Sequence, residues 1–198
     1  MSIFTILLSL ALWGAVHSFL ASHFAKDMLA GILGREMMRF YRFGYNVFAV
    51  LSFAPIFYLT ASLPNRMAYE VPSPWNLAML AGQLVAAVFL LVAFLQTDSL
   101  SFVGLRQFFV EKEDTGPLVT RGLYRIVRHP LYTFSLLYIW LTPSVSQNSL
   151  TLYVGATLYV LTGIYFEERK LLRDFGEAYA EYKRVTPMLI PWLSIGEK

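Results

Sequence analysis

Two groups of ionisable side chains flank a long apolar stretch in the C-terminal part of the chain. The stretch is preceded by Arg128, His129 and Tyr132 and followed by Glu167 and Glu168. An arginine and a histidine beside a helix N-terminus can bind a carboxylate or a phosphate. Paired carboxylates can bind an amine, accept hydrogen bonds from ribose hydroxyls or remove a proton. If the two groups meet, they predict a site for a small zwitterionic ligand.

The apolar stretch between these groups has the length of two helices. Its two segments, Leu131–Val145 and Leu150–Phe166, are joined by the uncharged turn Ser144–Ser149. A two-helix hairpin returns the chain to the side on which it began, so the two polar groups should meet there. Pro130 suits the first turn of the first helix. That helix would direct free N–H groups and a partial positive charge toward the same place.

The composition predicts an integral membrane protein. Of the 198 residues, 57% are hydrophobic and 15% are charged, which is too apolar for a soluble core of this size. Three further apolar segments, Ile3–Ala21, Gly44–Leu63 and Trp75–Gln96, have about the 20 residues that a membrane-spanning helix needs. The expected fold is therefore all-α with five transmembrane helices. The last two segments are short and could form a tilted hairpin or one that does not fully cross.

A cytoplasmic amphipathic helix is expected after the fifth segment. Apolar and aromatic residues recur there at steps of three or four, and Pro187 and Pro191 should end the helix. The residues with this spacing, which begin with one glutamate, are Glu168, Leu171, Leu172, Phe175, Tyr179 and Tyr182.

The basic residues predict the orientation in the membrane. With five crossings, all but one of the 16 Lys and Arg residues lie on one side, and Arg66 is the exception. The positive-inside rule makes that side cytoplasmic, so we expect the N-terminus outside and the C-terminus and the site inside. Because no Lys or Arg precedes Ile3, the first segment is expected to stay as a membrane helix. A bacterial inner membrane is the expected location, and the endoplasmic reticulum is the alternative.

Several classes of site are disfavoured. The chain has no cysteine, which excludes disulfides and thiolate metal sites. A metal or haem site is not expected, because His17 and His23 are six residues apart and His129 is distant in sequence. Nucleic-acid binding is not expected either, because the basic residues alternate with membrane segments. His17 lies inside the first apolar segment, where a hydrogen bond to a neighbouring helix is favoured over a functional role.

S-adenosylmethionine has the features that the predicted site would bind, since it carries an amino-acid end, a ribose and a sulfonium. No GxGxxG motif occurs, so this motif gives no support for a soluble nucleotide-binding methyltransferase domain. The alternative is that Arg128 and His129 reach lipid phosphates while the two glutamates balance charge at a helix end. That alternative does not explain why a proline, a tyrosine and an acidic pair occur together.

Three motifs resemble those of the isoprenylcysteine carboxyl methyltransferase-like superfamily, which also includes phospholipid N-methyltransferases. They are RGLYRIVRHPLY, the EER that closes the hairpin, and the tail FGEAYAEYKR…P…IP. The segments HSFLAS (His17–Ser22) and FVGLRQ (Phe102–Gln107) are similar to the nurim branch, which includes bacterial methanethiol S-methyltransferases and NnrU-like proteins.

The resemblance implies roles for particular residues. It places Arg128 and Glu167 beside the reacting groups as catalytic residues. The Met188–Pro191 strip would lie near the adenine. Thr133 and Phe134 depart from the family pattern, in which many relatives have a small residue and a glycine. The implied cofactor-binding residues are Tyr124, His129, Tyr132, Glu168, Leu189 and Pro191.

The sequence therefore predicts a single membrane methyltransferase domain over residues 1–198, with N-terminal helices in 1–96 and a catalytic part in 116–192. S-adenosylmethionine would be the cofactor, and the acceptor a small thiol or another lipophilic nucleophile that arrives through membrane lipid. Glu167 could remove the thiol proton, or Arg128 could favour the thiolate. The alternatives are a phospholipid N-methyltransferase, a prenyl-cysteine carboxyl O-methyltransferase and a non-enzymatic membrane accessory protein. The oligomeric state is left open.

Overall fold

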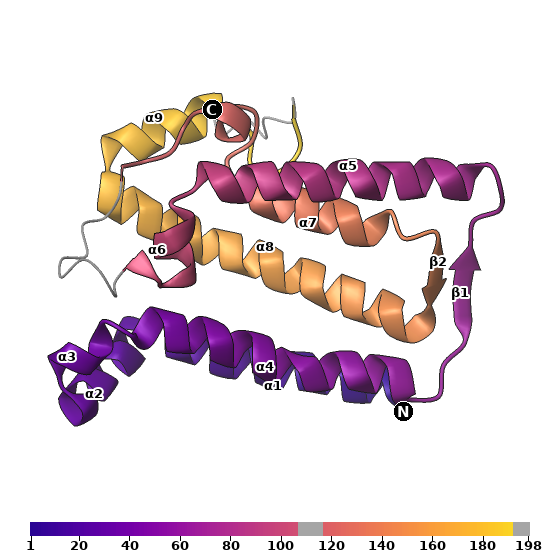
Figure 1. The fold of residues 1–198 in the computed structure, drawn as a ribbon, viewed down its shortest axis with the longest axis horizontal. Helices are drawn as coiled ribbons and strands as arrows, with labels where there is room; N and C mark the ends of the chain where they lie inside the picture. Colours follow the sequence, from indigo (N-terminus) through magenta and orange to yellow (C-terminus); the bar gives the residue numbers. More distant parts are fainter. Residues whose placement is uncertain (107–116, 192–198) are drawn as a thin grey trace. The chain divides into compact units, whose positions relative to one another are not determined.

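The computed structural model describes residues 1–106 and 117–191, which are mostly helical (Figure 1). The end of the Phe102–Gln107 motif and both ends of the predicted catalytic part lie outside the described residues. The chain forms two compact units, and each is described by itself. Of the described residues, the first contains 1–68, 99–106 and 146–156, and the second contains 69–98, 117–145 and 157–191.

Four helices among the described residues are long and apolar enough to cross a membrane. They are α1 (Ser2–Ala21), α4 (Tyr41–Ser62), α5 (Trp75–Gln96) and α8 (Gln147–Phe175). The chain is therefore an integral membrane protein. The first three helices match predicted segments to within a few residues. The fourth is longer than predicted, because it continues past Phe166 into charged sequence.

The fourth predicted segment, Leu131–Val145, is helical only in part. Its helix, α7 (Pro130–Trp140), has 11 residues. At about 1.5 Å per residue it is roughly 16 Å long, against a hydrocarbon core of about 30 Å. Pro130 occupies the first turn of α7, as predicted. After α7 the chain passes through a turn at Leu141 and continues into the short strand β2 (Ser144–Ser146).

The first unit is built on α1 and α4, which lie side by side. The Tyr41 hydroxyl donates to the carbonyl of Leu20 at 2.6 Å. The Tyr45 hydroxyl lies 2.7 Å from Nε2 of His17, whose ring also stacks on Trp13 at a centroid distance of 4.6 Å. The expected hydrogen bond between His17 and a neighbouring helix is thus confirmed. Two short helices, α2 (His23–Leu33) and α3 (Arg35–Met38), join α1 to α4 and were not predicted.

A third short helix, α6 (Ser99–Val103), packs on the start of α4 in the same unit. Nη1 of Arg42 donates to the carbonyl of Ser101 at 3.0 Å, and Nδ2 of Asn46 donates to that of Val103 at 2.9 Å. Gly104 then ends α6 with φ +89°. This conformation favours glycine, and a Cβ there would overlap the backbone of Phe43.

A Gly104→Ala substitution is expected to destabilise the protein by at least about 1–3 kcal/mol, the usual cost of forcing a side chain into such a conformation. Thermal unfolding in detergent would show this as a lower Tm. Gly44→Ala is the matched control, because Gly44 lies inside α4 and a Cβ there meets nothing within 4 Å. That control should be neutral or stabilising. Equal Tm values for the two variants would refute the close approach.

The second unit is built on α5 and α7, which also lie side by side. Phe89 of α5 stacks on Phe134 of α7 with centroids 5.0 Å apart. Nε2 of Gln83 donates to the carbonyl of Tyr138 at 2.9 Å. Nε1 of Trp140 donates to Oγ1 of Thr157 on α8 at 3.0 Å. Phe134, which departs from the family pattern, therefore has a packing partner on α5.

The structure also contains a short sheet and a 3-10 turn. The strands β1 (Met67–Glu70) and β2 form a two-stranded sheet, which was not predicted. Near it, the amide of Val71 donates to the carbonyl of Pro143 at 2.9 Å. The 3-10 turn η2 (Gly122–Arg125) precedes α7. Oε1 of Gln96, at the end of α5, accepts the amide of Leu123 at 2.8 Å and so fixes this turn.

The prediction of a single amphipathic helix after Phe166 is wrong in one respect, because the structure has two helices there. Helix α8 continues to Phe175, and α9 (Glu177–Val185) begins after Gly176. Gly176 has φ +54°, so the chain turns there in a conformation that glycine adopts readily. The periodic spacing runs through the break, which is why periodicity alone did not reveal it. The helix ends before Pro187, as predicted.

Candidate active site

The two polar groups meet in the second unit, as the hairpin predicts. Nε of Arg128 donates to Oε1 of Glu168 at 2.7 Å, and Nη2 lies at the same distance from that oxygen. Nη1 donates to the backbone carbonyls of Lys183 and Thr186. The Arg128 side chain is 8% exposed. It therefore ties the start of α7 to α8 and to the end of α9, an arrangement called the Arg128 clamp below.

Glu168 is surrounded by cationic and donor groups. Besides Arg128, it has Nε2 of His129 at 3.2 Å from Oε1 and Nζ of Lys183 at 3.4 Å from Oε2. Its side chain is 11% exposed. Because both oxygens already face protein groups, this carboxylate has little capacity left for a ligand.

His129 lies between the two glutamates. It is 5% exposed, with Nε2 near Glu168 and Nδ1 4.0 Å from Oε2 of Glu167. One ring nitrogen of His129 therefore faces each glutamate. Its ring is tilted against that of Tyr132 with centroids 5.7 Å apart.

Glu167 differs sharply from its neighbour. Its side chain is 41% exposed, and Oε2 accepts a hydrogen bond from the Tyr132 hydroxyl at 2.9 Å. Burial and the Glu167 charge raise the pKa of Tyr124 to about 12, so that hydroxyl stays protonated at neutral pH. Glu167 is thus an accessible carboxylate with His129, Tyr132 and Tyr124 around it. Such a group can remove a proton or bind a cation.

The tail that follows α9 runs beside the start of α7. The amides of Arg128 and His129 donate to the carbonyls of Pro187 and Met188 at 2.9 and 3.2 Å. Oγ1 of Thr133 donates to the carbonyl of Leu189 at 2.9 Å. Thr133, the other departure from the family pattern, therefore helps to fix the tail.

Not every predicted residue has a polar link to this cluster, and some of the cluster's residues were not predicted. Within the described residues, no polar contact joins Pro191 to the cluster. Two residues that contact Arg128 or Glu168, Lys183 and Thr186, were not predicted. Their only signal was their place in the tail motif.

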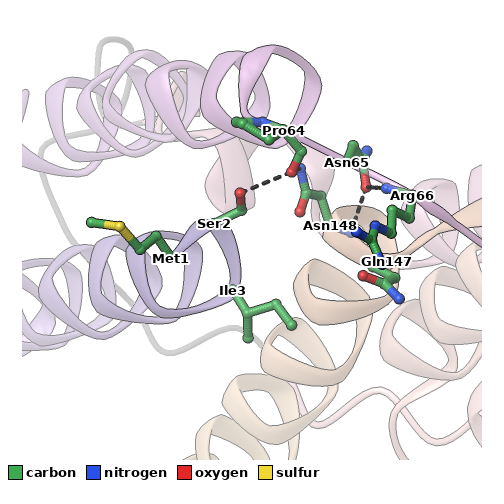
Figure 2. A pocket seen from close by; sticks show the side chains of 8 residues that line it. All are labelled: Met1, Ser2, Ile3, Pro64, Asn65, Arg66, Gln147 and Asn148. Carbon is green, nitrogen blue, oxygen red and sulfur yellow. Dashed lines mark hydrogen bonds between the residues drawn. The ribbon is translucent and has the colours of Figure 1, made fainter.

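A separate cavity of about 200 Å³ lies in the first unit (Figure 2). None of the predicted site residues lines it. The Ser2 hydroxyl donates to the carbonyl of Pro64 at 2.8 Å, and Oδ1 of Asn65 accepts the amides of Arg66 and Asn148. The Asn148 side chain donates to backbone carbonyls at the end of α4. These polar groups satisfy one another, which indicates a structural role.

Residues 77–178 match the profile of the phospholipid methyltransferase family. The matched region contains both polar groups and most of the second unit, although it ends before the tail. Because it covers half of the chain, the chain belongs to this family.

The relatives are named for methyl transfer to sulfur or to a prenylated cysteine. Methanethiol S-methyltransferase 2 of Bradyrhizobium diazoefficiens is 38% identical over 134 residues, which are 62% of this chain and 52% of the relative. Methanethiol S-methyltransferase 1 of the same organism is 33% identical over 193 residues, 94% of this chain and 66% of the relative. Protein-S-isoprenylcysteine O-methyltransferase of Xenopus laevis is 38% identical over 87 residues, 42% of this chain and 30% of the relative.

The chain spans between half and two thirds of the length of these methanethiol S-methyltransferases. No solved structure matches it.

Proposed function

We propose that this protein is a membrane methyltransferase that uses S-adenosylmethionine and acts on a small thiol or another lipophilic acceptor. The observation that carries the proposal is the contrast between the two glutamates. The side chain of Glu168 is 11% exposed and held by three basic residues, whereas that of Glu167 is 41% exposed and keeps acceptor capacity. A purely structural charge cluster has no need of an open carboxylate beside a buried histidine. Membership of the phospholipid methyltransferase family gives independent support.

The residues present fit S-adenosylmethionine. Glu167 would offer a negative charge to the sulfonium and to an acceptor beside it, and the phenols of Tyr124 and Tyr132 can bond the polar groups of the cofactor. His129 presents Nδ1 on the same side. Glu168 would act mainly by holding the His129 ring in position, because its own oxygens are already bonded within the protein. Leu189 and Pro191 would lie near the adenine, in keeping with the packing of the tail beside α7.

When bound, S-adenosylmethionine would supply a methyl group on an already activated sulfonium. The protein then has to hold the acceptor in line, which can supply several kcal/mol by removing translational and rotational freedom. A carboxylate oxygen of Glu167 would take the proton of the thiol and later release it to water. The resulting thiolate would be the nucleophile for the methyl group that the cofactor supplies, with a neutral thioether as the leaving group. Arg128 would support this step by holding Glu168 and the end of α9 in place, because its guanidinium is bonded to Glu168 and to the carbonyls of Lys183 and Thr186.

The acceptor is proposed as a small thiol because the methanethiol S-methyltransferases match more of the chain than the prenyl-cysteine enzyme does. One match of the former type covers 94% of this chain, against 42% for the latter. A small apolar thiol would also reach the site through lipid. Phospholipid amines and prenyl-cysteine carboxylates are the competing acceptors.

We also propose five membrane crossings, with the N-terminus outside and the site in the cytoplasm. In the second unit, Gln96 at the end of α5 contacts the turn before α7, and Val71 before α5 contacts Pro143 after α7. The run from Pro130 to Ser146 therefore returns along the whole of α5, although only part of it is helical. This return supports a fifth crossing, which would put all but one of the basic residues on one side, as the positive-inside rule requires. A bacterial inner membrane is the proposed location.

Incubation of the purified protein with methyl-labelled S-adenosylmethionine and a panel of acceptors tests the proposal. The panel contains methanethiol, longer alkyl thiols, phosphatidylethanolamine and a prenyl-cysteine analogue. We expect label in the volatile thioether fraction. Label in lipid or in the prenyl-cysteine ester would reassign the acceptor. No transfer to any of them, by a protein that also fails to bind the cofactor, would favour an accessory role.

A further inference from the structure

The Tyr179 hydroxyl is a buried polar group that the predicted site did not include. Tyr179 is 1% exposed, and its hydroxyl has no hydrogen-bond partner among the described residues. Buried polar groups in folded proteins nearly always have a partner, because an unpaired one loses its bonds to water without compensation. We therefore expect the hydroxyl to bind a water molecule or a ligand.

The position of Tyr179 connects it to the site. It lies on α9, whose last turn is held by Arg128 through the carbonyl of Lys183. Its ring packs edge-to-face on Tyr182 with centroids 6.0 Å apart. Tyr182 in turn donates its own hydroxyl to the carbonyl of Tyr124, so it already has a partner. The two phenols, one turn apart on the same helix, thus differ in whether the protein satisfies them.

The charges around Tyr179 determine what its hydroxyl can do. Burial and the negative charge of Glu168 raise the pKa of Tyr179, and the nearby Arg128 charge opposes this only partly. The phenol therefore stays protonated at neutral pH. A protonated phenol with no partner can donate one hydrogen bond to an acceptor atom.

We propose that the Tyr179 hydroxyl donates a hydrogen bond to an acceptor atom of bound S-adenosylmethionine. This inference rests on the proposed function. Two parts of the cofactor carry acceptor atoms, namely the carboxylate of the methionine part and the oxygen and nitrogen atoms of the adenosine part. The competing explanation is a water molecule or a structural void, in which case the hydroxyl has no role in binding.

Substitution of Tyr179 by Phe removes the hydroxyl and keeps the ring. In the full chain in detergent, Tyr179→Phe should weaken binding of S-adenosylhomocysteine by about tenfold in calorimetry, the usual effect of one lost hydrogen bond of this kind. The Tm of the ligand-free protein should be unchanged or higher, because no protein bond is lost. Tyr182→Phe is the matched control, and it should lower the ligand-free Tm because its hydroxyl bonds Tyr124.

A second ligand identifies the part of the cofactor that is bound. 5′-Methylthioadenosine lacks the amino-acid part, so weaker binding of both ligands assigns the bond to adenosine, and weaker binding of S-adenosylhomocysteine alone assigns it to the carboxylate. Unchanged affinity for both ligands, or a ligand-free Tm below that of the wild type, would overturn the proposal. If the wild type binds neither ligand, the proposed function itself fails, and this inference with it.

Discussion

Glu167→Gln is expected to lower kcat for methyl transfer to a thiol by about 100-fold or more, the usual contribution of a general base. Glutamine keeps the shape of the side chain and can still accept the hydrogen bond from Tyr132. It cannot take the proton of the thiol, so the thiolate has to form without help. The measurement is kcat at saturating cofactor and thiol, together with the Tm of the variant, which should stay close to that of the wild type because Glu167 is 41% exposed.

Glu181→Gln is a suitable control for this experiment. Glu181 is exposed on α9, where it pairs with Arg184 at 2.7 Å. Its loss should leave kcat unchanged. If Glu167→Gln also retains kcat within about threefold of the wild type, a difference too small for a lost general base, the assignment of Glu167 as the base is wrong.

Arg128→Met is expected to give the largest loss of stability. The substitution leaves the buried Glu168 without its closest cation and frees the carbonyls of Lys183 and Thr186. Breaking a buried ion pair in this way costs about 3–5 kcal/mol. Thermal or urea unfolding in detergent should show a markedly lower midpoint. Arg128→Lys should recover little, because one ammonium group cannot reproduce the forked geometry of the guanidinium.

Arg184→Met serves as the comparison for the Arg128 clamp. Arg184 forms an ion pair that is exposed to solvent, with its side chain 72% exposed, so its loss should hardly change the midpoint. Similar midpoints for the Arg128 and Arg184 variants would show that the Arg128 clamp does not hold α7, α8 and α9 together.

Much of the fold follows from the apolar segments. A run of about 20 apolar residues can satisfy its backbone in lipid only as a helix, so α1, α4 and α5 were predictable to within a few residues. The meeting of Arg128 with Glu168 was also predictable, because a hairpin must return to its starting side. The start of α7 was predictable from Pro130, because proline suits the first turn of a helix.

Other features depend on tertiary contacts that a periodic pattern does not contain. Helix α7 ends at Trp140 and Ser144–Ser146 forms a strand, because β2 pairs with β1. The break at Gly176 depends on one backbone conformation. The difference between Glu167 and Glu168 was also hidden, because neighbouring identical residues give no sign of which one faces Arg128. For the same reason, Arg128 looked like an open anion-binding group, whereas its donors are bonded within the protein.

The central claim is that Glu167 and the residues around it, His129, Tyr132 and Tyr124, bind the cofactor. A cryo-electron microscopy structure of the full chain with S-adenosylhomocysteine would test it most directly. The account predicts ligand density against Glu167, His129 and Tyr132, with the Arg128 clamp unchanged. Density at another place, such as the cavity lined by Ser2, Asn65 and Asn148, would contradict it.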